Sequence, residues 1–318
     1  MHNQILNLVS PFAWGCKLSE QKVRIGAACM PIKYDKEENL KSIIGFIEEC
    51  ASRKADLLVL PETCLQGYCW DAESFYDYEQ RKYYLESAEP LPGPSTKIVA
   101  SYAKRYNLFV QMGVAERAPV GGGAVIYNSV VLIGPTGVVG ISRKIHNKSE
   151  DAIFNDGNEI VVWETPFAKL GPIICYDLCF PEVTRVQALK GAEMITMSTA
   201  WSNGGGSDPD FGARSYDAIS MAVAITNQLW LVQSNAVGTS EGGKSSSDLY
   251  GHSRILSPLG QIVAESRGEG LAFGEIDLKQ GVLNARTKDM FGMNMIKDRK
   301  PRLYEPISDM SIYESQSS

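Results

Sequence analysis

Cys175 stands where an apolar run, residues 170–174, ends and a polar, proline-containing segment begins. The run predicts a buried strand, and the segment 182–189 that follows has helical periodicity. Unpaired backbone N–H groups at the start of such a helix, together with its positive dipole end, would favour a thiolate over a thiol. Cys175 is therefore a candidate nucleophile, although a free cysteine more often packs as a small buried hydrophobe.

Two further charged residues follow predicted strands. Glu62 comes just after the apolar segment 56–60, and Lys144 comes after the segment 138–141. A glutamate at a strand end often only caps the next loop, and most lysines are exposed surface charges. Glu150, which lies beyond Lys144, is equally uninformative when taken alone. The interpretation therefore depends on how these residues combine.

Four separated motifs contain these residues and follow one another in a definite order. They are Leu60-Pro61-Glu62, Arg143-Lys144-Ile145-His146, Glu150 with Phe154 to Gly157, and Ile174-Cys175-Tyr176-Asp177 with Phe180-Pro181-Glu182. Smaller pieces accompany them, such as Pro92-Gly93-Pro94-Ser95-Thr96, Tyr127-Asn128-Ser129 and Asp298-Arg299-Lys300-Pro301. Each motif is weakly specific, but in this order and spacing the set resembles the nitrilase superfamily of carbon–nitrogen hydrolases, over roughly residues 22–305.

The resemblance implies a four-layer αββα sandwich and a role for each matching residue. Glu62 would be the general base, Lys144 the cation that stabilises the oxyanion, and Cys175 the nucleophile. Glu150 matches a second glutamate that many members place beside the lysine. The backbone N–H of Tyr176 is a second candidate oxyanion donor. Because two such units commonly pair through their helices, a homodimer or higher homo-oligomer is expected.

These residue types suit the hydrolysis of an amide. A free thiol is only slightly ionised at neutral pH, so a carboxylate that takes its proton raises the reactive fraction. The carbonyl oxygen becomes anionic as its carbon becomes tetrahedral, and an ammonium group with a backbone N–H stabilises that charge. Ammonia or an amine leaves, and activated water hydrolyses the acyl-cysteine.

The residues after Cys175 favour an amide among the substrates of the superfamily. Nitrile-cleaving members usually have Trp-Glu after the cysteine, whereas this chain has Tyr176-Asp177. Carbamoyl-amino-acid hydrolases use arginine around the positions of Leu178 and Cys179, so these residues mildly disfavour an N-carbamoyl substrate. The order of preference is therefore a linear small-molecule amide, then a ureido or N-carbamoyl compound, then a nitrile. A non-catalytic interaction protein comes last.

Four aromatic residues next to the motifs are candidates for the wall of a substrate pocket. They are Tyr68, Trp70, Phe154 and Trp201, each of which could equally belong to the core. Cys179 could be a second reactive thiol, but packing as a buried cysteine is favoured. These residues do not predict the identity of the substrate.

The composition narrows the functional classes. The 318 residues carry a net charge of −6 from 31 basic and 37 acidic residues, without a basic block. This balance argues against nucleic acid or an anionic membrane as the main partner. The seven cysteines and three histidines do not form a zinc-site pattern. No metal or cofactor is therefore expected, and a reducing, cytoplasmic location is favoured. No run approaches the ~18 apolar residues of a membrane span.

Strand and helix patterns alternate without a linker, which predicts one α/β domain. The domain is expected over residues 22–305, between an extension at 1–21 and a tail at 306–318. The predicted strands are 23–30, 56–60, 108–116, 124–133, 138–141, 170–174, 193–198, 229–235, 252–257 and 261–264. One predicted helix begins at residue 35, and three others cover residues 95–106, 182–190 and 212–227. The aromatic-rich stretch up to Tyr84 is too irregular to assign.

Overall fold

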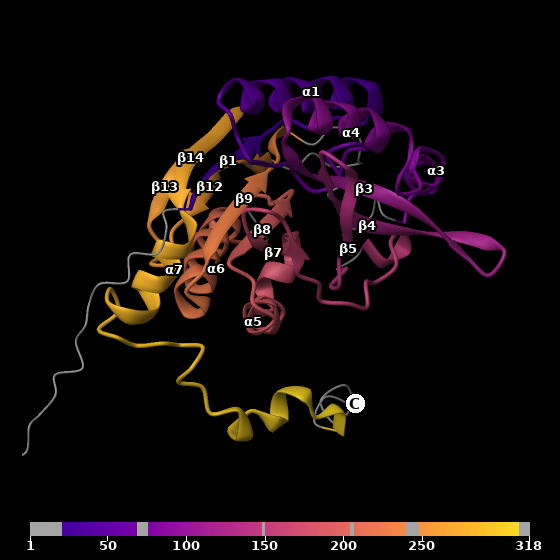
Figure 1. The fold of residues 1–318 in the computed structure, drawn as a ribbon. Helices are drawn as coiled ribbons and strands as arrows, with labels where there is room; N and C mark the ends of the chain where they lie inside the picture. Colours follow the sequence, from indigo (N-terminus) through magenta and orange to yellow (C-terminus); the bar gives the residue numbers. More distant parts are fainter. Residues whose placement is uncertain (1–20, 69–75, 148–149, 204–206, 240–247, 312–318) are drawn as a thin grey trace, which may run out of the picture.

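A computed structural model describes residues 21–68, 76–147, 150–203, 207–239 and 248–311. Within these ranges two six-stranded sheets pack face to face (Figure 1). The first sheet, in the order β14-β1-β2-β3-β4-β5, comprises β1 (Lys22–Cys29), β2 (Leu57–Val59), β3 (Phe109–Val120), β4 (Gly123–Gly134), β5 (Gly137–Arg143) and β14 (Gly270–Asp277). The second, in the order β13-β12-β9-β8-β7-β6, comprises β6 (Trp163–Glu164), β7 (Lys169–Ile174), β8 (Met194–Thr199), β9 (Trp230–Asn235), β12 (Ser253–Leu256) and β13 (Ile262–Ser266). β10 (Val237–Thr239) and β11 (Asp248–Tyr250) pair antiparallel as a separate two-stranded sheet.

Helices cover the outer face of each sheet. The helices α1 (Lys36–Ser52) and α4 (Pro94–Tyr106) pack on the first sheet, and α5 (Pro181–Leu189) and α6 (Phe211–Asn227) pack on the second. Figure 1 shows the resulting order of helix, sheet, sheet and helix. The αββα sandwich predicted from the sequence is therefore confirmed.

Both faces of the central strands are buried, which explains their nearly continuous apolar sequences. In β1, Ile25 and Ala27 belong to the core between the two sheets, whereas Ala28 belongs to the core beneath α1 and α4. In β2, Leu57 and Val59 point to the first of these cores and Leu58 to the second. The alternation places each side chain in an apolar layer, so the sheet has no solvated face at these strands.

The topology brings several strand ends to the same edge. β1, β2 and β3 run parallel to one another, and so do β7, β8 and β9. Gln111 of β3 links the two sheets, because its Nε2 donates to Ser198 Oγ at 3.0 Å and its Oε1 accepts from Thr196 Oγ1 at 2.6 Å. This buried link holds β3 against β8.

Pattern reasoning missed β14, α3 (Tyr78–Ser87) and α7 (Leu278–Thr287). β14 pairs antiparallel with β1 along its whole length, but its glycines and charged residues give little strand signal. In α3 only Tyr84 is buried, so apolar periodicity is absent, and the Asp77 carboxylate caps the helix by accepting from two backbone N–H groups. β14 and α3 therefore depend on tertiary or capping contacts rather than on a periodic pattern of apolar residues.

The predicted extension, residues 1–21, lies almost wholly outside the described residues. Beyond α7 the chain contains two short 3-10 turns, Pro301–Leu303 and Glu305–Ser308, in a segment that Figure 1 shows on the side of α5. Tyr304 and Ile307 of this segment line a pocket together with Pro181 and Arg185 of α5. None of the helices in the described ranges combines the length and apolar character that a membrane crossing needs.

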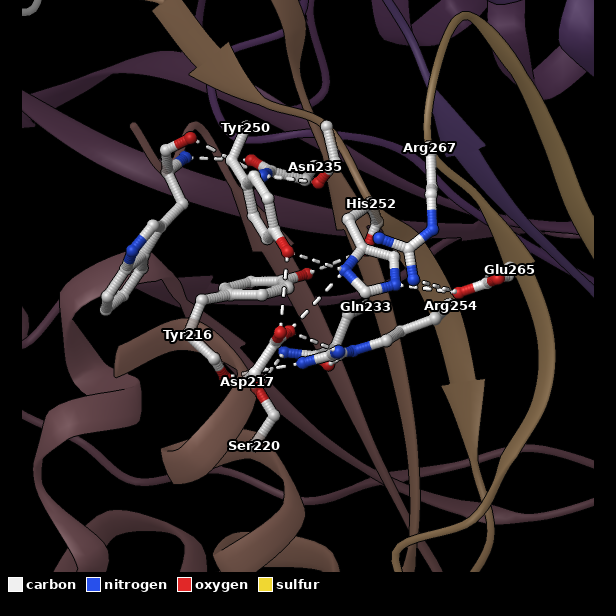
Figure 2. A network of polar contacts seen from close by, with 12 residues as sticks. Tyr216, Asp217, Ser220, Gln233, Asn235, Tyr250, His252, Arg254, Glu265 and Arg267 are labelled. Carbon is white, nitrogen blue, oxygen red and sulfur yellow. Dashed lines mark hydrogen bonds and ion pairs between the residues drawn. The ribbon is translucent and has the colours of Figure 1, made fainter. Parts of the chain in front are cut away.

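A polar network anchors α6 to the second sheet (Figure 2). The Arg254 side chain is fully buried and donates to Asp217 Oδ1 at 2.6 Å and to Gln233 Oε1 at 2.9 Å. His252, also buried, contacts Glu265 Oε2 at 2.8 Å. Burial lowers the pKa of His252, which favours the neutral ring. The network therefore pairs one buried cation, Arg254, with the partly exposed carboxylate of Asp217, and it holds a second partly exposed carboxylate, Glu265, against His252.

Replacing Asp217 with asparagine is expected to lower the free energy of unfolding by about 1–3 kcal/mol, because the buried Arg254 loses its carboxylate. Asp217 is 39% exposed, so water replaces part of the lost contact and the effect stays below that of a fully buried pair. Urea denaturation measures the change. Asp208→Asn, which breaks the exposed pair with Arg214, is the control and should destabilise the protein clearly less than Asp217→Asn. Equal losses in both variants would contradict the prediction.

Candidate active site

Glu62 follows β2 in a turn that packs closely on β3. A Cβ at Gly113 of β3 would lie only 2.3 Å from the Pro61 carbonyl oxygen, so glycine is needed where the turn crosses. The Glu62 side chain is fully buried. Its Oε1 accepts from Asn128 Nδ2 at 2.7 Å and from Lys144 Nζ at 2.8 Å. Its Oε2 accepts from the Ala200 backbone N–H at 3.1 Å. The carboxylate is thus held from three directions.

Lys144 follows β5 directly, and its backbone N–H donates to the Asn128 carbonyl at 2.8 Å, which continues the pairing of β5 with β4. Its side chain is fully buried, and Nζ contacts Glu62 Oε1 at 2.8 Å and Glu150 Oε1 at 2.5 Å. Burial by itself lowers the pKa of Lys144, but the Glu150 and Glu62 charges outweigh it and raise that pKa well above the usual value. Lys144 is therefore a permanent cation at neutral pH.

Glu150 opens a 3-10 turn, Glu150–Ala152, and is buried. Its Oε1 also accepts from the Tyr68 hydroxyl at 2.5 Å, and its Oε2 accepts from Asn128 Nδ2 at 3.1 Å. The pKa of Glu150 is raised above its usual value, because the effect of burial exceeds the lowering effect of the Lys144 charge. Burial also raises the pKa of Tyr68 well above its usual value, so its hydroxyl stays protonated and remains a donor.

Cys175 begins a 3-10 turn, Cys175–Cys179, directly after β7. It has a positive φ of 45°, which is rare for a residue other than glycine. The side chain is 6% exposed. Burial and the Glu62 charge raise the pKa of Cys175 well above its usual value, although Lys144 lowers it. The resting group is therefore a thiol.

This state differs from the prediction of a thiolate at a helix start. The α-helix α5 begins only at Pro181, so Cys175 lies in the preceding turn and not at the helix N-terminus. Desolvation consequently decides the pKa of this thiol, and a base is needed to ionise it.

Asp177 joins the turn of Cys175 to the segment that carries Lys144. Its Oδ1 accepts from the His146 backbone N–H at 3.0 Å and contacts His146 Nδ1 at 2.9 Å, and its Oδ2 accepts from the Ile174 N–H at 3.3 Å. The carboxyl group is buried. Tyr176, the candidate source of an oxyanion N–H, lies between Cys175 and Asp177 in this turn.

Three contributors were not predicted as site residues: Asn128, Ala200 through its N–H, and Asp177. Asn128 had a visible signal, because it is a polar residue in the middle of the apolar strand β4. The Ala200 N–H had none, since any residue type supplies a backbone donor. Tyr68, which was predicted as a pocket residue, donates its hydroxyl to Glu150 Oε1.

The remaining aromatic pocket candidates and Cys179 differ in their burial and in their contacts. Phe154 is buried and packs edge-on against Tyr84 with ring centroids 5.2 Å apart, as a core residue does. Trp201 is partly buried, and its indole N–H donates to the Gly212 carbonyl at 2.9 Å. Trp70 lies outside the described residues. Cys179 is a free cysteine of intermediate exposure.

The buried charges around Cys175 can support proton transfer and the stabilisation of negative charge. One permanent cation, Lys144, lies between two carboxylates, and the Glu62 and Lys144 charges both act on the thiol of Cys175. A carboxylate in this place can accept the thiol proton, and the ammonium group can stabilise negative charge on a bound substrate. Together these groups suit acyl transfer through a thioester.

Residues 24–282 match the family model of the carbon-nitrogen hydrolases. The chain therefore belongs to this family, and its recognition from the four motifs as a member of the nitrilase superfamily is confirmed.

Relatives with different names resemble the chain over most of its length. A nitrilase of Pyrococcus abyssi is 31% identical, over 84% of this chain and 93% of its own. A citrullinase of Francisella tularensis is 27% identical, over 90% and 98%. An omega-amidase NIT2 of Danio rerio is 23% identical, over 87% and 99%. Among solved structures, Nit3 of Saccharomyces cerevisiae superposes with a TM-score of 0.71 at 25% identity, over 84% of this chain and 94% of its own. The chain is thus a carbon–nitrogen hydrolase in sequence and in fold.

Proposed function

We propose that this protein hydrolyses the carbon–nitrogen bond of a small, linear amide through an acyl-enzyme on Cys175. The observation that carries the proposal is the buried Lys144 ammonium shared by Glu62 and Glu150, and the charges of these three residues act on the thiol of Cys175. A buried cation held by two carboxylates would be costly for a merely structural role, because each ion must lose its water.

In the proposed reaction Glu62 carries two protons in turn, first one from Cys175 and then one from water. Glu62 takes the Cys175 proton as sulfur bonds to the carbonyl carbon, and Lys144 with the Tyr176 N–H stabilises the oxyanion. Glu62 then gives the proton to the departing nitrogen as the carbon–nitrogen bond breaks, which leaves a thioester. Water, deprotonated by Glu62, attacks the thioester, and Glu62 passes the proton that it took from water to the Cys175 sulfur as the carboxylic acid leaves.

Hydrolysis of a ureido compound is the second candidate. The similarity to a citrullinase over nine-tenths of the chain favours it. Against it, Leu178 and Cys179 stand where related carbamoyl hydrolases carry arginine, and neither can form an ionic contact with a substrate carboxylate. An amide is therefore preferred, and a nitrile is third because Tyr176-Asp177 follows the nucleophile.

Ammonia and carbon dioxide release should be measured on primary amides, ureido compounds and nitriles, with Cys175→Ala as the blank. We expect ammonia without carbon dioxide from amides, and none from the blank. Release of both products from ureido compounds alone would move the assignment to the second candidate. Amide turnover that survives in Cys175→Ala would reject the acyl-enzyme.

We further propose that the protein forms a homodimer or higher homo-oligomer in the cytoplasm. Exposed apolar side chains at the ends of the outer helices, Leu189 of α5 and Phe211 of α6, support the first part. The described cysteines are free thiols, which fits a reducing compartment. Sedimentation at micromolar concentration tests the association, and a species of 34.9 kDa alone would contradict it.

A further inference from the structure

Asn128 of β4 contacts the three charged residues Glu62, Glu150 and Lys144. Its Nδ2 donates to Glu62 Oε1 at 2.7 Å and to Glu150 Oε2 at 3.1 Å. Its backbone carbonyl accepts from the Lys144 N–H at 2.8 Å. The residue is fully buried, so water does not compete for these contacts. One side chain therefore joins the two carboxylates that share the lysine.

The orientation of the amide follows from its neighbours. Asn128 Oδ1 is buried and accepts no hydrogen bond. Rotating the side-chain amide by 180° would give this oxygen no donor and would place it against two carboxylates, whose oxygens only accept hydrogen bonds when ionised. An unsatisfied buried oxygen carries a free-energy cost. The position therefore retains the residue for its two N–H donors and not for its carbonyl.

The donors also make the two oxygens of Glu62 unequal. Oε1 receives two hydrogen bonds, from Asn128 and Lys144, whereas Oε2 receives one, from the Ala200 N–H. A carboxylate oxygen offers about two acceptor sites. Oε1 is consequently saturated, and Oε2 keeps one site for an incoming proton.

We propose that Asn128 is a positioning residue that bridges Glu62 and Glu150, holds both carboxyl groups around Lys144, and leaves Glu62 Oε2 as the oxygen that takes the Cys175 proton. This inference rests on the proposed function of the site.

The charged and titratable groups around Glu62 explain why a neutral donor is needed. Lys144 faces it from the end of β5, Glu150 from its 3-10 turn, Cys175 from the turn after β7, and Tyr68 from the loop after β2. Only one of these groups is a cation. Two buried carboxylates that share one cation tend to retain a proton between them, and a hydrogen bond to the ionised form opposes this.

Two substitutions of Asn128 test the bridge. Asn128→Asp preserves shape but replaces the donor with a third carboxyl group, and Asn128→Leu removes the donor without adding charge. The matched control is Asn227→Asp in α6, where Nδ2 also donates twice, to Val223 O and Thr184 Oγ1, and Oδ1 is likewise unpartnered. The measurements are kcat/KM for an amide against pH and the rate of Cys175 alkylation by iodoacetamide against pH. Alkylation is quantified by tandem mass spectrometry on the tryptic peptide 170–185, with fragment ions that distinguish Cys175 from Cys179.

Both Asn128 variants are expected to move the midpoint of the acidic limb upward by about one pH unit or more, and to recover rate at higher pH. Asn227→Asp should keep the wild-type midpoint whatever its effect on stability. Wild-type midpoints in both Asn128 variants, with only a lower plateau, would overturn the proposal. Because alkylation needs no substrate, it tests the bridge even if wild-type protein fails on amides, a result that would reject only the proposed function.

Discussion

Glu62→Gln is expected to lower kcat for amide hydrolysis roughly a thousandfold, within the range for loss of a general base. The substitution keeps the side-chain shape but removes the proton acceptor. Burial, the largest cause of the raised pKa of Cys175, remains in the variant. The thiolate therefore forms only as the pH becomes alkaline, and the residual rate should climb with pH instead of reaching a plateau near neutrality.

The control is Glu89→Gln, since Glu89 is also buried, accepts from the Ser95 backbone N–H and hydroxyl, and pairs with Lys36 away from the site. Its kcat should stay within a few-fold of wild type. Pre-steady-state kinetics with a chromogenic amide or ester would separate acylation from deacylation, and both steps should slow. A Glu62→Gln enzyme with wild-type turnover and a wild-type pH profile would remove Glu62 from the role of base.

Lys144→Met is expected to lower kcat by about 10²–10³, because the oxyanion loses its cationic donor. Methionine fills most of the space, but it leaves Glu62 and Glu150 buried without the ammonium group that both contact. Lys144 is what lowers the pKa of Glu150, so its removal raises that pKa further.

A pH-dependent loss of stability should accompany the loss of activity. A carboxyl group whose pKa is raised on folding binds a proton more readily in the native state, so the free energy of unfolding falls as the pH rises. We expect Lys144→Met to be more stable at pH 5 than at pH 8 relative to wild type, in urea denaturation. Lys169→Met, which breaks only the exposed pair with Glu164, should show neither effect. A pH-independent destabilisation would contradict the shared-cation interpretation.

Local patterns predicted the elements that are apolar on both faces. The strands β1, β2 and β7 were recognised because burial on two sides produces uninterrupted apolar runs. Glu62 lies a few positions after the end of β2, and Cys175 follows β7 directly. β14 and α3 escaped because one depends on its pairing with β1 and the other on a cap and on Tyr84. Such contacts leave no periodic signal in the chain.

The sequence by itself determined the family, the αββα layers and which residue types stand at the strand ends. Only the tertiary structure decided how they meet, because the partners are far apart in the chain: Glu62 and Lys144 are separated by 82 positions, and Ala200 donates to Glu62 across 138. The protonated thiol at Cys175 and the bridge at Asn128 are among the features that the tertiary structure decided. Burial and hydrogen-bond partners set the charge state of a group, and both are properties of the packed molecule rather than of the residue or its neighbours in sequence.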